Sequence, residues 1–154
     1  MPTEAEWEKA ARGGASGHRF PWSDADTITW SRANYEAYPS SYAYDVNPTS
    51  GYNPAWTSGG SPYTTPVGSF AANGYGLYDM AGNVWQWCWD WYGSYSSGSQ
   101  TDPRGPASGS LRVFRGGGWD SNAFRCRVAS RREYDWPDYV NSGMGFRAVL
   151  PSGQ

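Results

Sequence analysis

The segment that most constrains the fold is residues 84–92, in which tryptophan occupies every second position. Successive side chains of a β-strand point to opposite faces of the sheet. One face of this segment would carry Trp85, Trp87, Trp89 and Trp91. The other face would carry Gln86, Cys88 and Asp90. The alternation therefore predicts a strand.

The clearest helical pattern is at the beginning of the chain. Thr3 is a favourable N-cap, and Glu6 follows three residues later, which is the spacing of a capping box. Apolar residues then recur on one side of the predicted helix, at Trp7 and Ala11 among others, and Gly13 with Gly14 ends it. Two further strands are predicted, over 111–115 and over 145–150, whereas 119–144 shows little periodicity.

Most of the chain between these elements reads as ordered loop. Residues 15–75 are rich in Gly, Pro, Ser, Tyr and Asn, with Trp22, Trp30 and Trp56 spaced among them. The whole chain of 154 residues has 20 Gly and 11 Pro, but it is also 18% aromatic, which disordered chains are not. We expect one α+β domain whose long loops are held by their own aromatic packing.

Charge and hydropathy exclude some functions. The net charge is −2 and no basic run occurs, so the chain lacks the electrostatic signature of a nucleic-acid-binding protein. No apolar stretch reaches membrane-spanning length. No apolar leader segment follows Met1, which predicts a cytoplasmic chain or one exported as part of a longer protein.

Four motifs, in this order, resemble the formylglycine-generating-enzyme (sulfatase-modifying factor) family. They are Pro-Thr-Glu-Ala-Glu-Trp-Glu-Lys-Ala-Ala-Arg-Gly-Gly at 2–14, Asn-Gly-Tyr-Gly-Leu-Tyr-Asp-Met-Ala-Gly-Asn-Val-Trp-Gln-Trp at 73–87, Arg-Val-Phe-Arg-Gly-Gly-Gly-Trp at 112–119 and Gly-Phe-Arg at 145–147. The resemblance implies a C-type-lectin-like α+β fold with a small antiparallel sheet, one N-terminal helix and long ordered loops. It also implies that residues 1–154 form a single domain without the family's usual first strand and helix. An uncovered sheet edge or apolar face would then favour self-association.

The cysteines argue against the family's oxidase chemistry. That chemistry uses a pair of copper-binding cysteines shortly after the glycine motif, and soft thiolates are the ligands that Cu(I) prefers. Here only Cys126 follows Gly116-Gly117-Gly118, and Cys88 lies in the tryptophan-rich segment. His18 is the single histidine, so a three-histidine iron site is also excluded. We expect no enzyme activity, no copper, and two buried reduced thiols, with one disulfide as the alternative.

The resemblance further implies a structural calcium ion, bound by hard oxygen ligands. The matching positions are Asp79, Gly82, Val84 and Gln86. Gln86 replaces the usual acidic residue and removes a negative charge, which should weaken binding. The alternative is a carbonyl-rich turn without metal.

The same fold also resembles the variable proteins of diversity-generating retroelements, whose hypervariable stretch corresponds here to 119–144. Tyr, Trp, Ser, Asn and Arg in that stretch are the residue types that adaptable binding surfaces use. The predicted ligand-binding residues are Asp120, Ser121, Phe124, Ser130, Arg132, Tyr134, Asp135, Trp136, Tyr139, Val140, Asn141 and Ser142. The expected partner is a protein.

Alternatives remain for individual residues and for the whole chain. Tyr134, Trp136 and Tyr139 are expected to be exposed, whereas Trp119 should enter the core. The arginines of this half, at 127, 131 and 147, are expected to pair with carboxylates such as Asp90 or with loop carbonyls. The alternative function is a degenerate or accessory sulfatase-modifying-factor-like domain of a larger enzyme or signalling protein.

Overall fold

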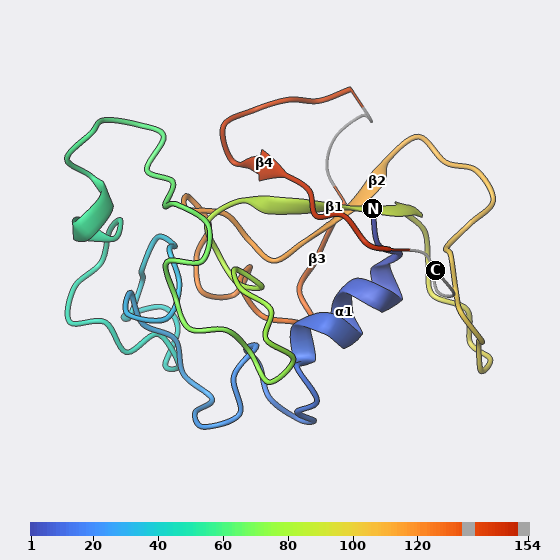
Figure 1. The fold of residues 1–154 in the computed structure, drawn as a ribbon, viewed down its shortest axis with the longest axis horizontal. Helices are drawn as coiled ribbons and strands as arrows, with labels where there is room; N and C mark the ends of the chain where they lie inside the picture. The colour runs from blue at the N-terminus through green and yellow to red at the C-terminus, as the bar shows by residue number, and fades with distance from the viewer. Residues whose placement is uncertain (134–137, 151–154) are drawn as a thin grey trace.

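A computed structural model describes residues 1–133 and 138–150 of the chain. It contains one helix, α1 (Glu4–Arg12), a single 3-10 turn at Pro54–Trp56, and four strands. The strands are β1 (Trp85–Trp91), β2 (Arg112–Arg115), β3 (Arg131–Glu133) and β4 (Met144–Gly145). Figure 1 shows the sheet and α1 in one half of the molecule and long connecting loops in the other.

Helix α1 begins and ends where the sequence predicted. The Thr3 hydroxyl accepts a hydrogen bond from the Glu6 backbone, and the Glu6 carboxylate accepts one from the Thr3 backbone, so the capping box is confirmed. Gly13 has φ 55°, a left-handed conformation that favours glycine. A Cβ at Gly13 would lie 2.8 Å from the backbone nitrogen of Gly74, so the close approach of the two segments also requires glycine.

The four strands form one sheet in the order β3-β2-β1-β4. β1 pairs with β2 and β2 with β3 in the antiparallel sense, but β4 runs parallel to β1, so the expected antiparallel sheet is in fact mixed. The strand predicted at 145–150 is wrong, because the pairing ends at Gly145. β3 was not predicted, since three residues are too few to show an alternating pattern.

The strand predicted at 84–92 is confirmed as β1, and its less hydrophobic face is the more deeply buried one, although Trp85 at the start of the other face is also buried. Gln86, Cys88 and Asp90 are buried on the side of the sheet where α1 lies, whereas Trp89 is 52% exposed on the opposite face. Cys88 packs there with Trp7 and Ala11 of the helix. The helix therefore packs on the face that carries Gln86, Cys88 and Asp90.

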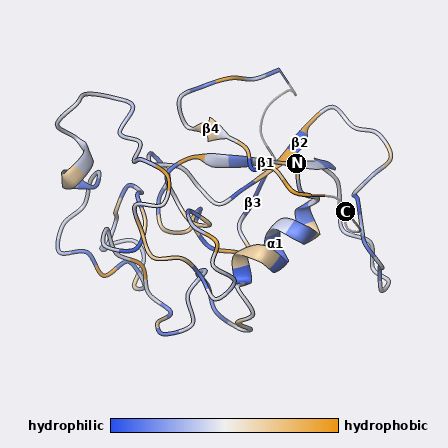
Figure 2. Ribbon diagram, viewed as in Figure 1, coloured by the Kyte–Doolittle hydropathy of each residue, from blue (hydrophilic) through white to orange (hydrophobic). Residues whose placement is uncertain are grey.

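A second core lies among the loops. Phe20, Ile28 and Tyr35 are fully buried there, and Trp22 and Trp30 pack against them. Trp22 donates from its indole nitrogen to the Thr27 carbonyl at 3.0 Å. The expectation that aromatic packing holds these loops is therefore confirmed. Most of the ribbon is pale in Figure 2, because Tyr, Trp, Gly and Ser, which dominate these loops, have intermediate hydropathy.

The C-terminal arginines serve the fold, as expected. Arg131 donates from Nε to Glu4 Oε1 at 2.9 Å and from a terminal nitrogen to the Gly93 carbonyl at 2.7 Å. Arg127 donates to the Phe124 carbonyl at 3.1 Å. The carboxylate partner of Arg131 is Glu4 and not Asp90, because Asp90 accepts a hydrogen bond from the Glu4 backbone at the start of α1.

Candidate functional site

Four of the predicted ligand-binding residues line one hollow of about 230 Å³ at the end of the sheet where β1 and β4 begin. They are Asp120, Arg132, Tyr139 and Asn141. Its floor includes Trp85 of β1 and Phe114 of β2. Residues from three separate segments of the chain therefore line one hollow.

The turn after the glycine motif places Asp120 at this hollow. The backbone nitrogen of Gly118 donates to the Ser121 hydroxyl at 3.0 Å, and the Ser121 nitrogen donates back to the Gly118 carbonyl at 3.0 Å. Gly117 has φ 77°, and a Cβ there would lie 2.8 Å from Cys126 Sγ. The glycines are therefore needed for the tight turn, and the turn directs Asp120 outward while Trp119 stays in the core.

The opposite wall of the hollow is the segment before β4. Asn141 accepts a hydrogen bond from the Gly143 backbone at 2.7 Å and donates to the Tyr139 hydroxyl at 3.0 Å. The Gly143 carbonyl accepts from the Trp85 backbone at 2.7 Å, which ties this wall to β1. Arg132 of β3 lies over the Trp85 ring, at 5.5 Å from its centre.

The predicted residues are distributed unevenly between surface and core. The exposed residues of the set are Asp120, Phe124, Tyr139, Val140, Asn141 and Ser142. Ser121 and Ser130 are only 6% and 3% exposed, so the structure corrects both as contact residues. Ser121 is buried because it closes the glycine turn. Tyr134, Asp135 and Trp136 lie outside the described residues. Trp119 is 8% exposed, which confirms its expected place in the core.

Sequence reasoning missed an aromatic group from the first half of the chain. Tyr52 and Tyr63 pack against Trp119, with ring centres 5.6 Å and 5.2 Å from it. Hydrogen bonds between Glu36 and Ser121 and between Ala37 and Gly51 bring these loops together. The high tyrosine content of 35–63 was the available signal, but it does not reveal which rings reach the 119–144 surface.

Comparison with known proteins identifies the family. The family described as Sulfatase-modifying factor enzyme 1-like domain matches residues 1–151. The chain belongs to this family. A formylglycine-generating enzyme of Thermomonospora curvata is 41% identical over 97% of the chain, which covers 48% of that enzyme. Serine/threonine-protein kinase pkn1 of Chlamydia caviae is 42% identical over 97% of the chain and 20% of the kinase.

A solved structure extends the likeness to the fold. Treponema denticola variable protein 1 has a TM-score of 0.69 and 36% identity, over 95% of this chain and 45% of that one. The C-type-lectin-like fold expected from the motifs is thus supported by structure as well as sequence. The chain spans half or less of the length of these relatives.

The two cysteines of this family member are separate and inaccessible. Both thiols are free and buried, Cys88 beneath α1 and Cys126 in the core of the loops. Burial raises the pKa of both thiols well above the usual range, which disfavours the thiolate that binds copper. The expectation of two reduced, buried thiols is confirmed.

Two of the four expected calcium ligands, Gln86 and Asp79, have protein hydrogen-bond partners. Gln86 Oε1 accepts from the Trp7 indole at 2.8 Å and from Arg147 Nε at 2.6 Å, and Gln86 Nε2 donates to the Asp79 carbonyl at 2.7 Å. The Arg147 guanidinium thus brings a positive charge to this position. Asp79 Oδ2 accepts from the Gly68 backbone, and Oδ1 is buried without a hydrogen-bond partner among the described residues. A calcium site through Gln86 does not fit this arrangement.

Metal-binding clusters and membrane-spanning helices are both absent from residues 1–133 and 138–150. No group of three or more His, Cys, Asp or Glu side chains there could hold a metal ion. No helix in the same ranges has the length and hydropathy needed to cross a membrane.

Proposed function

We propose that this chain is a non-catalytic ligand-binding domain that recognises a protein through the surface formed by 119–144. The observation that carries the proposal is the shared hollow, where Asp120, Arg132, Tyr139 and Asn141 meet although they come from three separate segments. Phe124 and Val140, the latter 86% exposed, extend this surface with apolar area. Aromatic anchors beside adaptable polar groups are characteristic of protein-binding surfaces.

The likeness to a variable protein supports this proposal, and the state of the cysteines supports the absence of turnover. Neither buried thiol is placed to react with a substrate, and the two belong to different cores. Recognition through exposed side chains requires none of the buried groups. The core can therefore stay fixed while the surface is adapted to a ligand.

Site-specific photo-crosslinking tests the proposal in the cells that make the protein. A benzophenone amino acid at position 139 should capture a discrete protein partner, and the same group at position 124 should capture the same partner. Val67 is 89% exposed and outside the 119–144 surface, so it is the matched control position. Identical partners from positions 139 and 67, or none from 139 and 124, would contradict the proposal.

A second candidate is an accessory domain of a larger signalling protein, which the likeness to a chlamydial kinase favours. It predicts that positions 120, 139 and 141 are constant among near-identical copies of the gene. The binding proposal predicts that copies differ there while Trp119 and Gly117 stay constant. Sequencing such copies from related strains separates the two candidates.

A further inference from the structure

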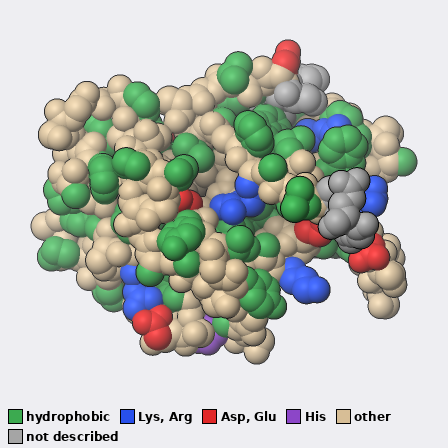
Figure 3. Space-filling model, in the orientation of Figure 1, with side chains coloured by type: hydrophobic (Ala, Val, Ile, Leu, Met, Phe, Trp, Pro, Cys, Tyr) green, Lys and Arg blue, Asp and Glu red, His purple; other side chains and the backbone are tan. Residues whose placement is uncertain are grey.

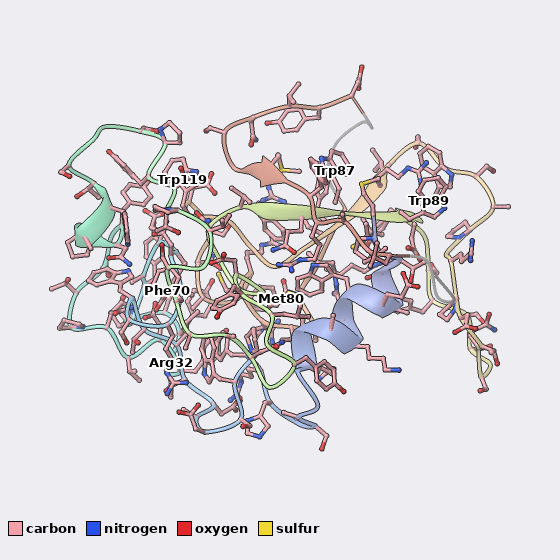
Figure 4. The ribbon with its side chains drawn as sticks, viewed as in Figure 1. Arg32, Phe70, Met80, Trp87, Trp89 and Trp119 are labelled. Carbon is pink, nitrogen blue, oxygen red and sulfur yellow. The ribbon has the colours of Figure 1, made fainter. Side chains whose placement is uncertain are left out.

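An acidic and aromatic patch adjoins the hollow. Its rings are Tyr52, Tyr63 and Trp119, which meet pairwise, with Tyr52 and Tyr63 centred 5.0 Å apart. Tyr52 is exposed, so part of the group faces solvent. Figure 4 shows Trp119 among the loops, well away from Trp87 and Trp89 on β1, so the patch is distinct from the tryptophans on the outer face of the sheet.

Two carboxylates lie beside these rings. The Glu36 backbone donates to the Ser121 carbonyl at 2.9 Å, and Ala37 and Gly51 exchange backbone hydrogen bonds of 2.7 Å and 2.9 Å. These bonds hold Glu36 next to both Tyr52 and the turn that carries Asp120. Burial, and then the negative charges of Glu36 and Asp120, raise the pKa of Tyr52. Neither carboxylate forms a salt bridge within the ranges that the structure describes.

A buried donor provides an independent sign of a missing ligand. The indole nitrogen of Trp119 is buried and has no hydrogen-bond partner among the described residues. Such groups are uncommon in native proteins, because an unpaired buried donor costs about 1–3 kcal/mol. A Cβ built on Gly143 would lie 3.8 Å from this nitrogen, so the donor sits just under the wall of the hollow.

We propose that this patch binds an arginine or lysine side chain of the protein ligand, between the Tyr52 ring and the carboxylates of Glu36 and Asp120. The inference rests on the proposed function and specifies the chemistry of its partner. Aromatic faces attract cations, and carboxylates form charge-assisted hydrogen bonds with them.

One face of the molecule can be compared with this patch. Charged side chains are sparse on the face drawn in Figure 3, where hydrophobic and uncharged polar groups dominate. Two carboxylates on such a face are therefore a distinguishing feature, although Arg132 lines the same hollow as Asp120.

The test titrates the whole chain with short blocked peptides. The three probes are Gly-Arg-Gly, the neutral Gly-citrulline-Gly of the same shape, and Gly-Glu-Gly. Indole and amide signals are followed by NMR, and the Trp119 indole is assigned from Trp119→Phe. The arginine peptide should shift the Trp119 and Gly51–Tyr52 signals saturably with a Kd of roughly a millimolar, as expected for a small ligand. The citrulline peptide should bind at least about fivefold more weakly.

Charge-neutral variants provide the control. Glu36→Gln and Asp120→Asn should each weaken the arginine peptide by about two- to fivefold, because each removes one partly exposed carboxylate. Asp102→Asn, an exposed carboxylate in the 93–110 loop, should leave the affinity unchanged. Equal affinity for arginine and citrulline peptides, or shifts confined to other parts of the chain, would overturn the inference.

The crosslinking experiment separates this inference from the proposed function. If position 139 captures a partner from both the unmodified chain and the double variant Glu36→Gln, Asp120→Asn with equal yield, the recognition surface is real and the cation preference is wrong. If the double variant loses the partner while Asp102→Asn keeps it, both stand. If no partner is captured at all, the proposed function fails. The peptide titration then decides by itself whether the patch binds a cation.

Discussion

Replacing Gln86 with leucine should test whether this buried amide holds the sheet, the helix and the C-terminal segment together. The Gln86 amide makes three hydrogen bonds, to the Trp7 indole, to Arg147 and to the Asp79 carbonyl. Leucine has a similar volume, so packing changes little. The main loss is at Trp7, which is fully buried and would keep an unpaired donor. Arg147 retains the Tyr78 carbonyl at 2.9 Å.

Gln86→Leu should lower the free energy of unfolding by about 2–4 kcal/mol. The buried Trp7 donor loses its acceptor, and the hydrogen bonds of Gln86 to Arg147 and to the Asp79 carbonyl are also lost. Unfolding in urea, followed by tryptophan fluorescence, measures it. Trp7→Phe removes the donor itself and is the matched second variant. The double variant should then cost about 1–2 kcal/mol less than the sum of the two single variants. Additive costs would refute the reasoning, because they would mean that the Trp7–Gln86 bond does not couple the helix to the sheet.

The remaining predictions concern the cysteines and calcium. Cys88 and Cys126 should react with a thiol reagent at pH 8 at least about 100-fold more slowly in the folded chain than in urea, because burial raises the pKa of both thiols and opening is rare; rapid labelling of either thiol in the native chain would contradict this. Chelation of calcium should leave the melting temperature unchanged within about a degree, because Gln86 and Arg147 satisfy the position where the ion was expected; a fall that calcium alone restores would show that Asp79 supports a site of its own.

The local elements were predictable because their signals are local. Thr3, Glu6 and Gly13 define α1 by chemistry that acts within a few residues. The alternation in 84–92 predicts β1 for the same reason. β3 and β4 were missed or misplaced because they are short, and pairing with β2 and β1 alone defines them. A local sequence pattern cannot predict a strand that is formed only by pairing with another strand.

Which face of β1 is buried could not be read from the sequence. Hydrophobicity alone would bury the tryptophans, yet the helix packs on Cys88, Gln86 and Asp90, and Trp89 is left exposed. The reason is that the polar groups of that face find partners on α1: Gln86 with the Trp7 indole, and Asp90 with the Glu4 backbone. A polar group that keeps a hydrogen-bond partner can be buried at little cost in free energy, so this face of β1 can pack against α1.

The sequence by itself determined the family, the helix and the central strand, because motifs and periodicity are properties of neighbouring residues. Only the tertiary structure decided that Ser121 and Ser130 are buried and that Glu36 and Tyr52 join Asp120 at one patch. Those residues meet through backbone hydrogen bonds between loops that carry no periodic pattern, at Glu36–Ser121 and Ala37–Gly51. A surface built by such contacts exists only once the chain has folded, because no segment contains it alone.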